Sequence, residues 1–179
     1  MEKGRLEAFS DGVLAIVITI MILELRLPSG DGVGDLLSLL PPLLTYLVSF
    51  LFIAIYWVNH HLVFHSVEQV DLPILWCNIT WLFFLSFIPF ATAWVGNHPT
   101  SWVPLSLYFS DMTLACIAFH LMCFYVQRIH GKRLRLGARS ITSLAVYFGA
   151  AALGGFCPVA AFIAVAAVSC SWIVPKKDG

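Results

Sequence analysis

Charged side chains are scarce in this sequence: Asp, Glu, Lys and Arg together make up 11% of its 179 residues. Soluble domains carry about 25% charged residues, so the shortage excludes an ordinary soluble protein. Hydrophobic residues reach 60%, and most of them fall in stretches long enough for the about 20 residues that a helix needs to cross a bilayer. Because a lipid-embedded backbone satisfies its hydrogen bonds internally as helix, we predict an all-α integral membrane protein.

Motifs that carry chemistry are also missing. The five cysteines form no CxxC pair and lie in apolar stretches, which indicates small apolar side chains rather than disulfides or metal ligands. A histidine box built on His60, His61 and His65 would need many more histidines and carboxylates on several helices. The sequence has no recognisable nucleophile–base pair or phosphate-binding loop. We therefore expect no enzymatic activity, no metal site, no cofactor and no nucleic-acid partner.

Six membrane spans can be placed along the chain, which is predicted to form a single six-helix unit over residues 1–179. The last apolar stretch is too long for one crossing. Gly154 and Gly155, followed by Pro158, are expected to divide it into two short helices. The predicted spans are 5–27, 40–65, 73–95, 101–127, 139–155 and 157–174.

The distribution of Lys and Arg predicts the orientation of these spans. Basic residues lie before the first span, in the segment 128–139 after the fourth span, and at Lys176 and Lys177. With six spans all three places fall on one side of the membrane, which the positive-inside rule identifies as the cytoplasm. Both termini are therefore predicted to be cytoplasmic, in a multi-pass protein of the cell membrane. The opposite mouth of the first span carries acidic residues, namely Glu24, Asp31 and Asp35.

Polar side chains occur inside the predicted spans, and each needs a partner because a charge near mid-membrane costs about 3 kcal/mol. Ser10 and Asp11 lie near the cytoplasmic end of the first span. We expect them to form a hydrogen-bonded cluster with Trp57, Asn78 and either His61 or the histidine before it. This cluster either holds the fold together or, through Asp11 and a histidine, relays protons.

Helical geometry separates a second face of the first span from this cluster. At 100° per residue, Asp11 lies about 140° from Ile16. An acid that points into the bundle therefore leaves Ile16 on a different face, which points to lipid, to a partner subunit or to a pore. The residues of this second face are Gly12, Ile16, Thr19, Ile20 and Leu23.

An RxxxFSD motif opens the first span, formed by Arg5, Phe9, Ser10 and Asp11. The motif resembles the signature of the transmembrane protein 175 family, the lysosomal and prokaryotic potassium channels. The likeness continues in "SDGVLAIVITIMILEL", in "YWVNHH" of the second span and in "LWCNITWLFFLSFIPF" of the third. It covers roughly the first ninety residues, and the later spans match only in number and length.

The resemblance implies a homotetrameric, potassium-preferring cation channel in which the first span of each subunit lines a central pore. By resemblance, the motif residues Arg5, Phe9, Ser10 and Asp11 tie this pore helix to the second and third spans. Members of the family lack the TVGYG filter, as does this chain, and they constrict the pore with rings of apolar side chains. Such rings are expected at Ile16, at Thr19 or Ile20, and at Leu23.

Potassium and other monovalent cations are the expected permeant partners, with the lipid bilayer around the channel. Four isoleucines offer no ligand, so an ion passes such a ring with part of its water retained. Potassium holds its water more weakly than sodium, which favours a modest potassium preference. The alternative is a proton-conducting channel or a proton-coupled secondary transporter that uses Asp11 and His61. Inverted repeats would favour the transporter, but the two halves of the chain share no motif.

Overall fold

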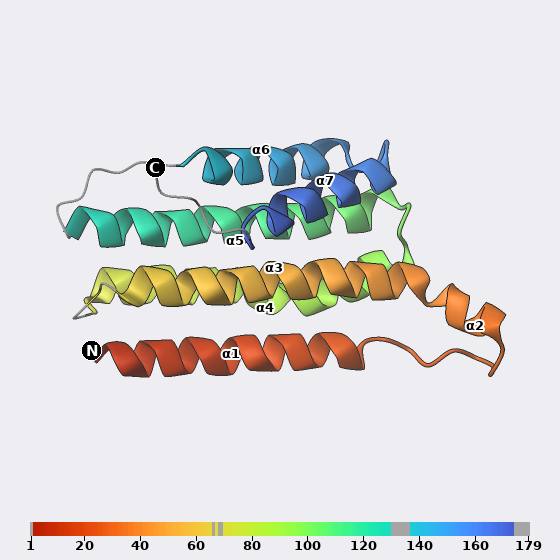
Figure 1. Cartoon of the computed structure of the whole chain (residues 1–179), viewed down its shortest axis with the longest axis horizontal. Coiled ribbons are helices and arrows are strands. Elements are labelled where there is room, and N and C mark those ends of the chain that lie inside the picture. The colour runs from red at the N-terminus through yellow and green to blue at the C-terminus, as the bar shows by residue number, and fades with distance from the viewer. Residues whose placement is uncertain (1, 66, 68–69, 130–136, 174–179) are drawn as a thin grey trace.

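A computed structural model of the chain describes residues 2–65, 67, 70–129 and 137–173 (Figure 1). The described residues form seven α-helices, and their bounds lie close to those of the predicted spans apart from the short α2, which was not predicted. The helices are α1 (Lys3–Leu23), α2 (Val33–Ser38), α3 (Leu40–His65), α4 (Leu72–Asn97), α5 (Trp102–Ile129), α6 (Ala138–Leu153) and α7 (Pro158–Cys170).

Four of these helices, α1, α3, α4 and α5, are long and apolar enough to cross a bilayer. Helices α6 and α7 are apolar but shorter, with 16 and 13 residues. At 1.5 Å per residue they measure about 24 and 20 Å, less than the about 30 Å of a hydrocarbon core. The prediction of an all-α membrane protein is confirmed, whereas the number of six crossings stays a prediction.

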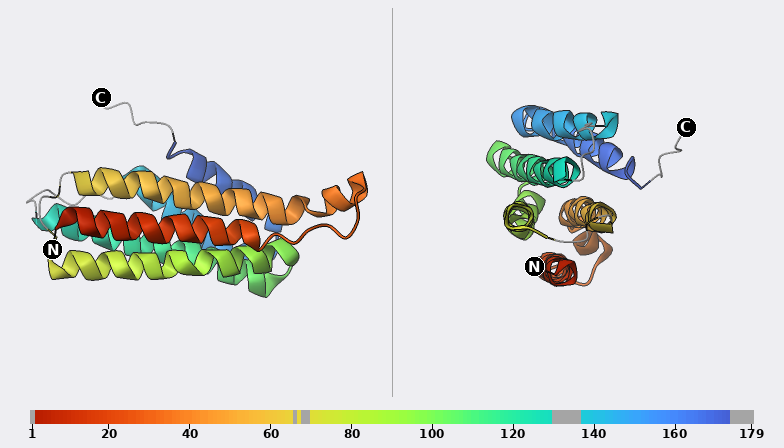
Figure 2. Two further views of the ribbon diagram at one scale, coloured as in Figure 1. Left: turned by 90° about the horizontal axis from the view of Figure 1, so that it is seen from below. Right: turned by 90° about the vertical axis from the view of Figure 1, so that its left-hand side faces the viewer.

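The helices run side by side, and α1 lies at one edge of the bundle (Figure 1). It packs against both α3 and α4, while α6 and α7 pack against α5 and α3 on the opposite side. Seen end on, α3 and α4 stand next to each other between α1 and the α6–α7 pair (Figure 2). Other helices of the subunit therefore cover α1 on one side only.

Helix α1 ends at Leu23, earlier than the predicted span 5–27. The helix ends where the apolar run gives way to Glu24 and Arg26. Pro28 keeps it from continuing further along the chain, because proline has no backbone N–H to donate to the preceding turn and disfavours helical backbone in the residue before it. The chain then loops to the short helix α2. Asp35 stabilises this loop, since its Oδ2 accepts a hydrogen bond of 3.2 Å from the backbone N–H of Gly32.

The core lies between α3, α4 and α5 and combines aromatic rings with satisfied hydroxyl groups. Trp81 of α4 is fully buried, and its ring lies 5.9 Å from that of Tyr56, centroid to centroid. Ser49 joins all three helices, with its Oγ 2.7 Å from Thr92 Oγ1 and 2.8 Å from Tyr108 OH. Because these buried hydroxyls bond to one another, the helices that support α1 have a defined register.

Helices α6 and α7 form a hairpin whose turn falls at the predicted glycines. A side chain at Gly155 would overlap the indole ring of Trp102, so the turn needs glycine to pack against the start of α5. At the open end of the hairpin, a hydrogen bond of 3.0 Å from Trp172 Nε1, just after α7, to Ser143 Oγ of α6 joins the two arms. The hairpin is thus a packed part of the subunit.

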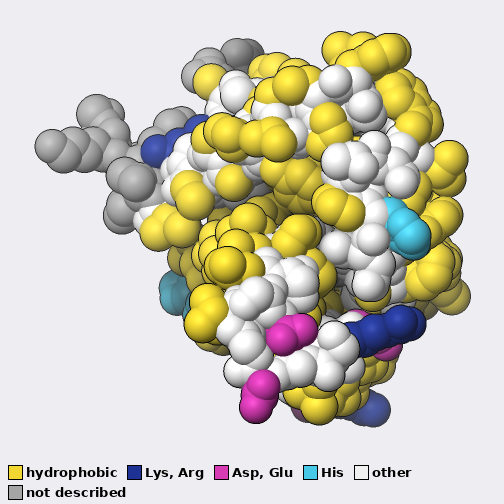
Figure 3. All heavy atoms as spheres, turned by 90° about the vertical axis from the view of Figure 1, so that its right-hand side faces the viewer, with side chains coloured by type: hydrophobic (Ala, Val, Ile, Leu, Met, Phe, Trp, Pro, Cys, Tyr) yellow, Lys and Arg dark blue, Asp and Glu magenta, His cyan; other side chains and the backbone are white. Residues whose placement is uncertain are grey.

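The surface of the bundle is largely apolar. Figure 3 looks onto the end that carries α2, where hydrophobic side chains make up much of the face and charged side chains gather toward one edge. Large exposed apolar side chains occur on every long helix, which fits contact with lipid or with other subunits. The predicted orientation also rests on residues outside the described ranges: Lys132, Arg133, Arg135, Lys176 and Lys177.

Candidate pore helix and its attachment

Helix α1 attaches to the bundle through one narrow stripe of side chains. The buried residues of the helix recur every three or four positions, which places them on a single face. Three of the five are large apolar side chains with almost no exposed surface, and one is a serine. The stripe consists of Leu6, Ser10, Leu14, Val17 and Met21.

A buried polar chain links α1, α4 and α3 at the position of Ser10. Asn78 Nδ2 donates a hydrogen bond of 3.0 Å to Ser10 Oγ, and Ser10 Oγ donates in turn to the carbonyl of Leu6 at 2.9 Å. His60 Nε2 lies 2.9 Å from Asn78 Oδ1, and the His60 ring stacks on Trp81 with centroids 5.0 Å apart. Since a carbonyl oxygen only accepts, His60 carries its proton on Nε2.

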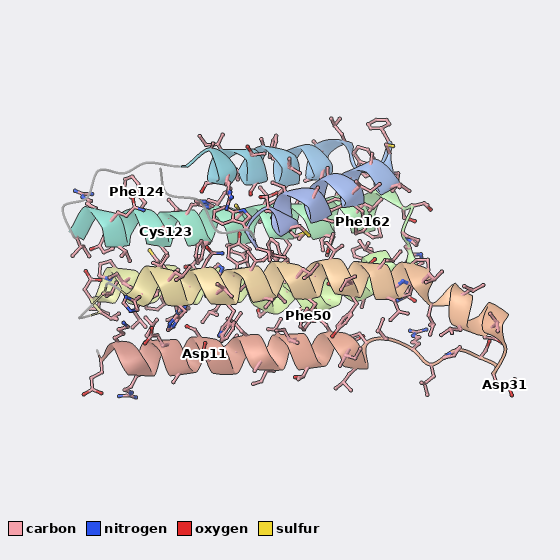
Figure 4. The ribbon with its side chains drawn as sticks, in the orientation of Figure 1. Asp11, Asp31, Phe50, Cys123, Phe124 and Phe162 are labelled. Carbon is pink, nitrogen blue, oxygen red and sulfur yellow. The ribbon has the colours of Figure 1, made fainter. Side chains whose placement is uncertain are left out.

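Asp11 makes a separate contact with α3. Its Oδ1 accepts a hydrogen bond of 2.9 Å from the indole Nε1 of Trp57, and both side chains lie on the exposed surface of the subunit. Figure 4 labels Asp11 on the side of α1 that faces α3. The aspartate thus fixes the rotation of α1 from the flank of the helix.

The structure corrects one residue of the predicted cluster. His60 enters the cluster, whereas His61 is exposed and lies with its ring 6.5 Å from that of His65. Two faces of α3 carry aromatic residues and histidines at a spacing of four residues: one holds Tyr56, His60 and Phe64, and the other holds Trp57, His61 and His65. Periodicity alone does not say which of these two faces turns inward.

The other two motif residues lie outside the cluster. Phe9 is 57% exposed and Arg5 is exposed in the first turns of α1. Of the motif, Ser10 and Asp11 therefore make the contacts with α3 and α4 that the structure describes. The role predicted for Arg5 and Phe9 remains a prediction.

The face of α1 away from the bundle carries the predicted pore residues. Ile16 is 59% exposed and Leu23 is 80% exposed, and Thr19 lies exposed between them. The Thr19 hydroxyl donates within its own helix, with Oγ1 3.0 Å from Ala15 O and 2.9 Å from Ile16 O. Because the donor is used by the backbone, the lone pairs of the hydroxyl oxygen remain able to accept.

A groove runs along α1 beside this face. Ile16 and Ile20 of α1 line it together with Pro89 and Phe90 of α4, and its volume is about 430 Å³. Glu24 lies at one end of the groove, just beyond the end of α1. The flank of α1 that faces α4 is therefore open, whereas the flank that faces α3 carries the contact between Asp11 and Trp57.

Two further polar residues lie on α5, away from α1. The ring Nδ1 of His120 lies 2.7 Å from the carbonyl oxygen of Cys116. Asp111 is buried, and its Oδ2 has no hydrogen-bond partner within the described residues. Among all the residues that the structure describes, no three His, Cys, Asp or Glu side chains converge in a way that could hold a metal ion.

The chain is similar to ion channels along most of its length. It is 38% identical over 183 residues to a potassium channel of Chryseobacterium sp. (strain P1-3), which covers 99% of this chain and 95% of that protein. The sequence profile described as endosomal/lysosomal potassium channel TMEM175 matches residues 5–89. The chain belongs to the TMEM175 family. The crystal structure of a lysosomal potassium-selective channel TMEM175 homolog from Chamaesiphon minutus matches with a TM-score of 0.80, 29% identity and 96% of both chains covered.

The match to the TMEM175 family includes the polar contacts that Ser10 and Asp11 make with α3 and α4. Residues 5–89 contain Ser10, Asp11, Trp57, His60 and Asn78. The family and these relatives are ion channels, in agreement with the prediction that this chain is not an enzyme. A more distant relative is the endosomal/lysosomal proton channel TMEM175 of Bos taurus, 34% identical over 103 residues, or 51% of this chain and 22% of that protein.

Proposed function

We propose that this protein is a potassium-preferring cation channel of the cell membrane, in which four copies of the chain surround a central pore. The observation that carries the proposal is the exposed face of α1 in a chain of the TMEM175 family. Apolar side chains on this face would meet around a four-fold axis. The bacterial relatives are named potassium channels, which supports potassium as the permeant ion.

The attachment of α1 supports the pore lining by its geometry. Ser10 is buried against α4, and Asp11 bonds to α3 from the flank. These contacts hold the helix so that Ile16, Thr19 and Leu23 face away from the bundle. A pore helix needs this arrangement, because its lumen-facing side chains must keep a constant rotation while ions pass.

The proposed filter works by partial dehydration. A ring of four Ile16 side chains offers no ligand, so the ion passes with retained water or the ring dewets and closes. The weaker hydration of potassium gives it the lower barrier. One helical turn away, the free lone pairs of four Thr19 hydroxyls would replace part of the lost water. Leu23 and Ile20 would form further apolar constrictions toward the acidic mouth.

The proposed topology has six crossings with both termini in the cytoplasm. The four long helices cross fully, and the α6–α7 hairpin completes the count although each of its helices is shorter than the hydrocarbon core. Arg5, Lys3 and the basic segment after α5 would then lie on the cytoplasmic side. The mouth with Glu24 and the Asp35 loop would face outward and attract cations.

Flux measurements on purified, reconstituted protein test this proposal. We expect a tetramer by native mass and potassium efflux from liposomes that reaches the Nernst equilibrium for potassium at any fixed pH, with or without a proton gradient. Efflux by a monomer or dimer would contradict the central pore.

Proton conduction is the second candidate, because the Bos taurus relative is named a proton channel. In this chain Asp11 accepts from Trp57, and the histidine of the cluster is His60 rather than His61. A relay through Asp11 and His61 would therefore need a different arrangement from the one described. Uphill potassium transport driven by an imposed pH gradient alone would favour a proton-coupled transporter and exclude the passive channel.

A further inference from the structure

Two outer edges of the subunit carry apolar stripes with similar spacing. On α4 the edge is mainly aromatic, and on α3 it is aliphatic; most of these side chains are exposed and the others are half-buried. We define the aromatic edge as Trp76, Thr80, Phe83, Phe87 and Phe90. We define the aliphatic edge as Leu47, Leu51, Ala54, Val58 and Leu62.

The two edges point away from each other. At 100° per residue, the aliphatic edge lies on the side of α3 opposite to Ser49, Tyr56 and His60, which contact α4. By the same geometry, the aromatic edge lies on the side of α4 opposite to Asn78 and Trp81. Since α3 and α4 stand next to each other above α1 in the end-on view (Figure 2), the edges flank the subunit on both sides of α1.

The two edges also lie at equal depths along the bundle. Within the subunit, Ser49 contacts Thr92. Farther along α3, Tyr56 contacts Trp81 and His60 contacts Asn78, each closer to the start of α4. The two helices therefore run antiparallel in a fixed register. In this register Phe87 is level with Leu51, and Phe83 is level with Ala54, each within about one residue or 1.5 Å.

Rotation about an axis parallel to the helices preserves the depth of every residue. If four subunits surround a pore lined by α1, the α4 side of one subunit must meet the α3 side of the next, because a ring is closed by heterologous contacts. Residues at equal depth on the two edges then face each other. The aromatic edge would thus pack on the aliphatic edge, with the bulky Phe83 against the small Ala54.

We infer that the aromatic edge of α4 binds the aliphatic edge of α3 in a second copy of this chain, and that this contact closes the channel ring. The inference rests on the tetramer under Proposed function and adds the surface that holds it together. Phe90 belongs both to the aromatic edge and to the groove beside Ile16 and Ile20. The subunit contact therefore continues directly into the proposed pore lining.

Cysteine cross-linking in membranes tests this contact. The five natural cysteines would be replaced, and native mass would first verify that this background has the same oligomeric state as the unmodified protein. The matched pairs are Phe87→Cys with Leu51→Cys and Phe83→Cys with Ala54→Cys. Each pair in one chain, treated with a short bifunctional thiol reagent, should give covalent dimers, trimers and tetramers. Co-expressed single variants should give dimers only.

The control variant combines Phe87→Cys with Leu62→Cys. Leu62 lies about three helical turns, or 16 Å, along α3 from Leu51, the residue at the depth of Phe87. This pair should give little or no cross-linking. A tetramer by native mass with no cross-link from either matched pair would overturn the inference, since lipid would then cover the edges, while the proposed channel would stand. Dimers from Phe87→Cys alone would also overturn it, because they indicate an isologous contact. A monomer by native mass would contradict the proposed tetramer and the inference together.

Discussion

Replacement of Asn78 by alanine should weaken the subunit more than any other single change in the attachment of α1. Asn78 is fully buried, and its amide bonds to Ser10 at 3.0 Å and to His60 at 2.9 Å. Asn78→Ala leaves the Nε2–H of His60 without an acceptor, which costs about 1–3 kcal/mol. Ser10 loses one accepted bond but keeps its own donation to Leu6, which adds about 1 kcal/mol or less.

The expected loss for Asn78→Ala is therefore about 1–4 kcal/mol. For a chain of this length, 1 kcal/mol lowers the midpoint of thermal unfolding by about 2–4 °C. The measurement is the temperature at which the purified protein in detergent loses its monodisperse size-exclusion peak. Asn97→Ala is the matched control, because Asn97 is exposed and its Nδ2 donates within its own helix, to Ala93 O at 2.7 Å.

Asn97→Ala should change the midpoint by no more than about 2 °C. A single hydrogen bond between membrane helices contributes about 0.6 kcal/mol on average in double-mutant cycles. A loss of that size for Asn78→Ala would therefore indicate an ordinary contact. If Asn78→Ala costs less than about 1 kcal/mol, the polar chain does not hold α1 in place, and the reasoning about the attachment is refuted.

Three further changes test other parts of the account. His60→Ala should lower the unfolding midpoint by several degrees, whereas His61→Ala should leave it almost unchanged; equal effects would contradict the corrected assignment. Gly155→Val should overlap Trp102 and destabilise the α6–α7 hairpin, seen as faster proteolysis at its turn, and a variant as resistant as the unmodified chain would contradict this packing. Thr19→Val should keep the fold and reduce potassium preference in reconstituted flux, and an unchanged preference would remove the hydroxyl ring from the filter.

Hydropathy predicted the long helices, because a lipid-embedded backbone has few alternatives to helix. The end of the first span was predicted at Leu27 because Pro28, Ser29 and Gly30 follow it, whereas the helix ends at Leu23, where the apolar run gives way to Glu24 and Arg26. The short helix α2 was missed because six residues in a polar loop carry no periodic signal. Its position depends on the contact between Asp35 and the loop.

The candidate site was predictable to the level of the helix face. The RxxxFSD motif identified Ser10 and Asp11, and their partners Asn78 and Trp57 followed from the requirement that buried polar groups be satisfied. The choice between His60 and His61 was not predictable, because both repeat with aromatic residues at helical spacing. It depends on how α3 packs on Trp81, which is a tertiary contact.

Substitution of Ile16 tests most directly whether the exposed face of α1 lines a potassium-preferring pore. The measurement is the reversal potential of reconstituted channels with potassium on one side and sodium on the other. Ile16→Asn should wet the ring and move the potential toward zero. Ile163→Asn is the control, because Ile163 lies on α7 and is similarly exposed, at 64% against 59%. This variant should keep the original potential. An unchanged potential in Ile16→Asn, or an equal shift in both variants, would contradict a filter at Ile16.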